Sequence, residues 1–200
     1  MARQWLWLWI MVLTCLLGAC SAPTTTSVMP DGLVLRQGDI VLRRGLGMAS
    51  RVVLAADDGG EYSHVGIVAQ YGDTLYVVHA VPYEGEEDRV VMELPERFFC
   101  TSNAVTGMVL RSGCDSVAKA AACHALAICL RGTLFNHDYD DSDTTRMYCS
   151  QLVEHVYSQA GMSLTGDVRH DIGLPGFRLQ HVILPSDFIR SPALKVVSRF

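Results

Sequence analysis

The segment Met147-Tyr148-Cys149-Ser150-Gln151-Leu152-Val153 decides the interpretation of this chain, because it places a cysteine where a loop becomes an amphipathic helix. Apolar residues recur after Cys149 at helical spacing, and Gly161 is placed to end the helix. A cysteine in the first helical turn faces unpaired N–H groups and the positive end of the helix dipole, which favour the thiolate. The sequence therefore predicts a nucleophilic Cys149 with a lowered pKa. The alternative is a small buried hydrophobic residue, as most free cysteines are.

Two histidines upstream supply a candidate base. His64 opens the β-rich run 64–70 and His79 lies in the run 75–81, with the turn Tyr71-Gly72-Asp73-Thr74 between them. This pattern predicts an antiparallel hairpin in which the two histidines face each other or nearly so. Cross-strand neighbours lie about 5 Å apart at Cβ, close enough for two imidazoles to hydrogen-bond.

Together these residues predict an acyl-transfer triad. Cys149 is the nucleophile, His64 the general base, and His79 the residue that orients the His64 ring. Two alternatives stay open from the residues alone: structural histidines, or a zinc ion held by all three side chains. No CxxC pair is present, and we expect neither a metal nor a cofactor.

The pattern along the rest of the chain predicts an α+β domain with no internal repeat. Strands are expected at 40–43, 90–94, 105–111 and 194–198, and helices at 46–56, from 115 or 116 to Gly132, and from Pro185. Cys100 and Cys114 flank one of these strands, and the sequence does not decide whether they pair.

The first residues are typical of a bacterial lipoprotein. Arg3 precedes an apolar run from Trp5 to Leu17, and Leu17-Gly18-Ala19-Cys20 resembles a lipobox. We expect a signal peptide at 1–19, a lipidated Cys20 followed by a flexible tether to residue 32, and one domain at 33–200. Ser21 carries no inner-membrane retention signal, so outer-membrane sorting toward the periplasm is expected.

The net charge of -5 is modest and the basic residues are scattered, which argues against nucleic acid as the main partner.

Four motifs resemble those of NlpC-like papain-fold cysteine hydrolases: Gly38-Asp39-Ile40-Val41, the segment 63–68, Val78-His79-Ala80 and the segment 148–153. The cysteine follows the histidines, which is the order of the circularly permuted branch, the YaeF/YiiX-type amidases. The resemblance runs from about Gly38 to Gly161. It implies a permuted papain-like fold, in which the nucleophile helix packs on an antiparallel sheet.

The resemblance also implies roles for single residues. Cys149 matches the family's nucleophile, His64 its base and His79 its third polar position, where relatives can carry glutamate. Gln151 stands where glutamate is common, and no loss of chemistry is expected from this difference. Unpermuted relatives place an oxyanion tyrosine before the cysteine, so Tyr139 is the candidate here for an oxyanion or substrate contact, together with Tyr62 beside His64.

The expected activity is cleavage of amide bonds through a Cys149 thioester. The expected substrate is a peptidoglycan stem peptide or an N-acylated small molecule, reached from a lipid anchor in the envelope. Two alternatives remain: a lipid acyltransferase or thioesterase on the same fold, and a non-catalytic lipoprotein that binds peptide or lipid.

Overall fold

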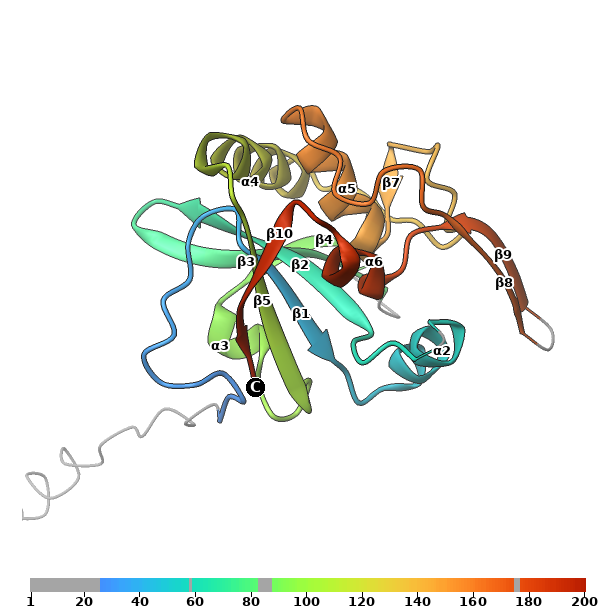
Figure 1. The fold of residues 1–200 in the computed structure, drawn as a ribbon, viewed down its shortest axis with the longest axis horizontal. Helices are drawn as coiled ribbons and strands as arrows, with labels where there is room; N and C mark the ends of the chain where they lie inside the picture. The colour runs from blue at the N-terminus through green and yellow to red at the C-terminus, as the bar shows by residue number, and fades with distance from the viewer. Residues whose placement is uncertain (1–25, 58, 83–87, 175–176) are drawn as a thin grey trace, which may run out of the picture.

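The computed structural model describes residues 26–57, 59–82, 88–174 and 177–200, which form an eight-stranded sheet with a two-stranded hairpin beside it (Figure 1). All neighbouring strands of the large sheet are antiparallel except the last two, which are parallel. In spatial order they are β10 (Leu194–Arg199), β5 (Thr106–Ser112), β1 (Ile40–Arg44), β2 (His64–Tyr71), β3 (Thr74–Val81), β4 (Arg89–Glu93), β6 (Leu134–Phe135) and β7 (Arg146–Met147). The predicted α+β class and the β2–β3 hairpin are confirmed.

Helices α4 (Asp115–Leu130) and α5 (Cys149–Gln159) cover one face of the sheet (Figure 1). Alanines on α4 are fully buried against the sheet, which lets the helix approach it closely. Gly132 and Gly161 follow the two helices with φ of +75° and +91°, the left-handed conformation that ends a helix. No helix formed by the described residues is long and apolar enough to cross a membrane.

The other face is covered by the short helix α3 (Pro95–Phe98) and by the chain before β1. The Thr26 carbonyl accepts a hydrogen bond from the Thr101 N–H at 2.9 Å, and Ser27 forms a β-bridge with Cys100. Val28 and Met29 pack against the apolar residues of this face. Residues 26–29, which the sequence analysis places in the tether before residue 33, therefore contact the domain; residues 1–25, with Cys20, lie outside the described residues.

Three further elements lie near the start of α5. They are α2 (Met48–Ala56), the hairpin of β8 (His170–Leu174) and β9 (Phe177–Val182), and α6 (Pro185–Arg190). The buried Asp57 carboxylate accepts hydrogen bonds from the Ser186 N–H at 3.2 Å and its hydroxyl at 2.5 Å, which ties the end of α2 to α6. The sequence analysis did not predict the β8–β9 hairpin.

Candidate active site

Cys149 is the first residue of α5, as the sequence predicts. Tyr148 before it has extended backbone angles, and its N–H donates to the Gln151 side chain at 3.2 Å, which fixes the start of the helix. The Cys149 sulfur accepts a hydrogen bond from the backbone N–H of Val65 on β2. The nucleophile is therefore tied to the strand that begins with His64.

The two histidines form the predicted pair. His64 Nε2 lies 2.8 Å from His79 Nδ1, with the ring planes 86° apart. The strand register pairs Ile67 with Val78, and its continuation sets Gly66, not His64, opposite His79. The imidazoles therefore meet diagonally across the ladder, on the same face of the sheet.

A third side chain, Glu93, extends this pair across β4. Its Oε1 lies 3.0 Å from His79 Nε2 but off the direction of the ring N–H, so the contact is a close charge contact rather than a straight hydrogen bond. Arg43 and Arg97 approach the same carboxylate at 3.6 Å and 3.5 Å. The sequence analysis assigned no role to Glu93; its only signal was an acidic residue at the end of an otherwise apolar strand.

The contacts define which ring nitrogens carry protons. An ionised carboxylate only accepts, so His79 Nε2 holds a proton toward Glu93. His79 Nδ1 then accepts from His64 Nε2–H, which leaves His64 Nδ1 with a free lone pair. This tautomer assignment follows from the His64–His79 hydrogen bond and from the negative charge of Glu93 beside His79 Nε2. It gives His64 the protonation state of a general base.

Burial sets the charge states of the site. It lowers the pKa of His64 well below its usual value of 6.5, and the Arg43 guanidinium and His79 act in the same direction. Burial also raises the pKa of the Cys149 thiol from its usual 9.0, with the Val65 N–H and Ser150 opposing it. The lowered Cys149 pKa expected from the sequence is therefore wrong, because desolvation of the thiolate outweighs the helix terminus. The resting pair is a thiol and a neutral imidazole.

We call His64, His79 and Glu93 the relay. It holds one negative charge, on Glu93. Burial works to raise the pKa of Glu93, but the contacts with His79, Arg43 and Arg97 together lower it. Burial lowers the pKa of His79 despite its Glu93 contact. Glu93 is thus ionised beside a neutral His79, ready to stabilise a positive charge that arises on the histidine pair.

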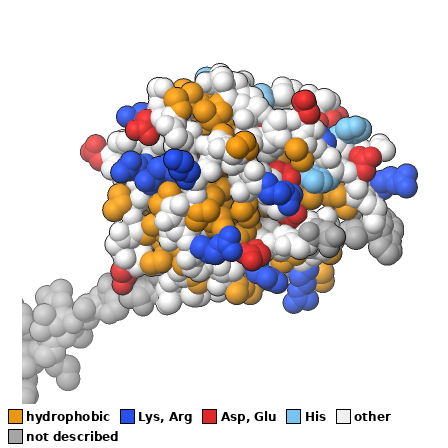
Figure 2. Space-filling model, in the orientation of Figure 1, with side chains coloured by type: hydrophobic (Ala, Val, Ile, Leu, Met, Phe, Trp, Pro, Cys, Tyr) orange, Lys and Arg blue, Asp and Glu red, His pale blue; other side chains and the backbone are white. Residues whose placement is uncertain are grey.

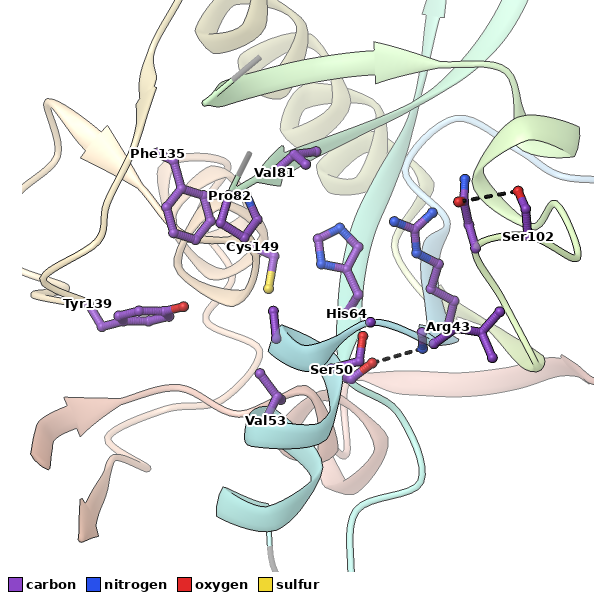
Figure 3. A pocket seen from close by; sticks show the side chains of 16 residues that line it. Arg43, Ser50, Val53, His64, Val81, Pro82, Ser102, Phe135, Tyr139 and Cys149 are labelled. Carbon is purple, nitrogen blue, oxygen red and sulfur yellow. Dashed lines mark hydrogen bonds between the residues drawn. The ribbon is translucent and has the colours of Figure 1, made fainter. Parts of the chain in front are cut away.

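Cys149 and His64 line one cleft of about 300 Å³. In Figure 3 the Cys149 sulfur and the His64 ring approach each other across this cleft, and the Tyr139 hydroxyl points toward the sulfur from the other side. Burial, and then the neighbouring Cys149, raise the pKa of Tyr139 to about 12. The Tyr139 hydroxyl therefore keeps its proton and can donate a hydrogen bond within the cleft.

Gln151 holds the loop that carries Tyr139. Its amide donates to the carbonyls of Asp140 and Asp143 at 3.3 Å and 2.8 Å, and Asn136 donates to the Asp140 carbonyl at 2.7 Å. Tyr139 has a φ of +53°, a left-handed conformation uncommon for tyrosine, which these bonds help to maintain. Gln151 thus links the cysteine helix to the tyrosine loop.

Tyr62, the other predicted tyrosine, is not brought to the cleft. Its side chain is 1% exposed in the core on the α4–α5 face and hydrogen-bonds to Thr106. It supports the fold next to His64 and has no place among the residues lining the cleft.

A second hollow of about 50 Å³ is also lined by Cys149. We call it the apolar hollow, because its lining is almost entirely hydrophobic. It shares Cys149, Tyr139 and Val53 with the cleft. The remaining lining residues come from α2, the start of α5, the β8–β9 hairpin and the chain leading into α6: Val52, Ala56, Tyr148, Ser150, Ile172, Leu179, Val182, Ile183, Leu184 and Pro185.

The zinc alternative does not fit this geometry. His64 and His79 direct ring nitrogens at each other at 2.8 Å, so the two rings do not converge with Cys149 on a common point. Within the described ranges, no group of three His, Cys, Asp or Glu side chains is arranged to hold a metal ion. Cys100 and Cys114 are both free thiols in the structure.

These features define a class of protein. A cysteine at the start of a helix, packed on an antiparallel sheet whose preceding strands carry the base, is the arrangement of a papain-like cysteine hydrolase in permuted chain order. Over residues 34–198 the chain matches the permuted papain-like amidase enzymes of the YaeF/YiiX, C92 family. The chain belongs to this family and is a cysteine hydrolase.

The solved structures agree on the fold. The chain is similar to a crystal structure described as the metalloprotein yiiX from Escherichia coli O157:H7, with a TM-score of 0.66 and 19% sequence identity. The similarity covers 82% of this chain and 97% of that one. No curated protein matches the sequence.

Proposed function

We propose that this protein is a lipid-anchored envelope enzyme that hydrolyses the amide bond of an N-acylated substrate through a thioester on Cys149. The observation that carries the proposal is the position of Cys149 between the cleft, with its His64–His79–Glu93 relay, and the apolar hollow. An apolar acyl group would then occupy the hollow and a polar amine half the cleft, with the reacting sulfur in the lining of both.

The proposed reaction uses His64 twice. His64 Nδ1 takes the thiol proton as the Cys149 sulfur attacks the carbonyl carbon, and the relay through His79 to Glu93 stabilises the imidazolium. The Cys149 N–H and the Tyr139 hydroxyl donate to the oxyanion. His64 then returns the proton to the leaving amine as the C–N bond breaks. Water, deprotonated by His64, attacks the thioester, releases the carboxylic acid and regenerates the thiol.

The apolar hollow supports an N-acyl substrate over a peptidoglycan stem peptide. Stem peptides are polar, whereas the hollow beside Cys149 offers aliphatic side chains such as Ile172, Val182 and Leu184. The same observation favours a second candidate, cleavage or transfer of an acyl group from a lipid ester or thioester. Both candidates share the acyl-enzyme and differ in the leaving group.

Substrate profiling tests the proposal. We expect the purified chain to hydrolyse N-acyl amino acids with short to medium acyl chains faster than stem peptides, with the acyl group trapped on Cys149 by acid quenching and mass spectrometry. Cys149→Ala abolishes turnover and the adduct, whereas Cys123→Ala, an exposed cysteine on α4, retains both. Faster release of stem-peptide amines would overturn the N-acyl assignment, and an active Cys149→Ala variant would overturn cysteine catalysis.

The proposed location is the outer membrane, facing the periplasm, through diacylglyceryl-modified Cys20. The support is the lipobox-like segment Leu17-Gly18-Ala19-Cys20 behind an apolar run, with Ser21 after it. Mass spectrometry of the mature N-terminus tests this, since an unmodified residue 20 contradicts the anchor.

A further inference from the structure

The described chain begins at the rim of the catalytic cleft. Thr26 accepts the hydrogen bond from Thr101, and Ser27 bridges to Cys100. The next two residues of that loop, Ser102 and Asn103, line the cleft. The N-terminal segment therefore enters the domain beside the mouth of the active site.

The chain between this entry point and the proposed lipid is short. Residues 21–25 separate Cys20 from Thr26, and a fully extended chain of that length spans about 20 Å. A domain of this size is about 40 Å across. This inference rests on the proposed lipidation of Cys20. Because the tether is shorter than the domain is wide, a lipid on Cys20 holds the Thr26 end of the domain toward the membrane and leaves little freedom to turn the opposite end toward it.

The cleft rim also carries an apolar surface, which we call the rim surface: Leu46, Met48 and Val105. These side chains are 49%, 71% and 53% exposed. The two sides of the rim surface are joined by the hydrogen bond from the Val105 N–H to the Arg44 carbonyl at 2.9 Å. Arg44 and Arg51 are exposed beside these residues. Exposed apolar residues flanked by arginines are typical of surfaces that lie in the membrane interface.

The figures are consistent with this arrangement. In Figure 1, α2 and the beginning of the described chain both lie in the lower half of the molecule, whereas α4 and α5 lie in the upper half. Hydrophobic and basic side chains meet along the lower edge of the face drawn in Figure 2. Helix α2 has no buried residue, and its Val52 and Val53 line the apolar hollow. One short helix thus connects the exposed rim surface with the hollow beside Cys149.

We propose that the rim surface binds the phospholipid surface in which Cys20 is anchored, so that the cleft of the enzyme faces the membrane. The tether length, the entry point of the chain and the apolar and basic character of the rim surface lead to this orientation. An acyl substrate that resides in the membrane then reaches the apolar hollow along α2. The enzyme would act on membrane-held molecules in preference to substrates free in the periplasm.

Site-specific photocrosslinking in membranes tests the orientation. A photoreactive benzoylphenylalanine is placed at position 48, 105 or 71 of the full-length chain, and phospholipid adducts are measured by mass spectrometry after irradiation. Tyr71 is the matched control, because it is 50% exposed but sits at the far end of β2 from His64. We expect phospholipid adducts at positions 48 and 105 at least fivefold above those at position 71.

Two results would overturn the inference, and they are distinguishable. Lipidated Cys20 with equal or greater adduct yield at position 71 rejects the orientation and leaves the lipid anchor standing. Unmodified Cys20 removes the anchor and the orientation together. Neither result depends on catalysis, so a failure of the proposed hydrolase activity is detected separately.

Discussion

His64 Nε2 and His79 Nδ1 lie 2.8 Å apart although the two residues are not cross-strand partners. The register offsets them by two positions, and the residue that stands between them on that face of β2 is Gly66. A Cβ at Gly66 would lie 3.1 Å from the His79 Cβ, 3.0 Å from the Val78 carbonyl and 2.7 Å from Val77. The glycine therefore provides the space in which the diagonal pair forms.

The relay predicts unequal losses when its members are removed. His64→Ala removes the base and should lower kcat by about 10³-fold. His79→Ala leaves the base but removes its orienting partner, so kcat should fall by about 10–100-fold with little change in KM. Steady-state kinetics on the same substrate compare the two variants. Equal losses would mean that His79 itself exchanges the catalytic proton.

Glu93→Gln should disturb the tautomers without changing the shape of the site. The amide can donate to His79 Nε2, which would place the His79 proton on Nδ1 and the His64 proton on the nitrogen facing Cys149. We expect kcat to fall by about 10–100-fold, less than the roughly 10⁴-fold loss when the carboxylate of a serine-protease triad is replaced by an amide, because Glu93 acts on His64 only through His79. The ¹⁵N chemical shifts of His79 report the tautomer directly.

Glu96→Gln on the neighbouring α3 is the matched control, since Glu96 is exposed. It should retain full activity. A Glu93→Gln enzyme with unchanged kcat and unchanged ¹⁵N shifts would show that Glu93 has no influence on the relay.

The charge states predict the pH profile. Only neutral His64 acts as a base, and burial lowers its pKa well below 6.5. Protonation therefore begins only below that pH, so kcat/KM should stay flat as the pH falls to 6.5 and decline under it. Alkylation of Cys149 by iodoacetamide should rise steeply only in the alkaline range, because burial raises the pKa of the thiol from 9.0. Fast alkylation with a plateau near pH 6 would instead indicate a thiolate–imidazolium pair at rest.

Local patterns in the sequence were sufficient to predict the central hairpin and the cysteine helix. Strand alternation around a Gly-Asp turn placed His64 and His79 on adjacent strands, and helical periodicity placed Cys149 at a helix start. The resemblance to a permuted family added the order of the elements, and the match over residues 34–198 confirmed it.

Other features depend on tertiary packing and were missed for that reason. Glu93 joins the site only through the β3–β4 register, which no local pattern specifies. The direction of the Cys149 pKa depends on burial, which outweighs the helix terminus. Residues 26–32 have the composition of a linker, yet Val28 and Met29 pack on the sheet. The apolar hollow is built from segments far apart in the chain.

Gly66→Ala tests the space under the histidine pair. The added methyl group must displace Val77, the Val78 backbone or His79, which should lower the free energy of unfolding by about 1–3 kcal/mol. Activity should fall as well, because displacing His79 lengthens its contact with His64. Gly113→Ala is the control, since a Cβ there meets nothing within 4 Å. Thermal unfolding and kinetics measure both effects; a stable, fully active Gly66→Ala variant would contradict the argument.

Tyr139→Phe tests the oxyanion donor, and Tyr62→Phe is its matched control. The Tyr139 hydroxyl points toward the Cys149 sulfur in Figure 3, and its pKa of about 12 keeps it protonated as a donor. Loss of one oxyanion donor costs about 10²-fold in kcat, and KM should change little because the ground-state carbonyl gains less from the contact. Tyr62 is buried away from the cleft and bonded to Thr106, so its variant should lose about 1 kcal/mol of stability and keep its kcat. If Tyr139→Phe changes KM alone, the hydroxyl binds substrate, and the Cys149 N–H remains as the oxyanion donor.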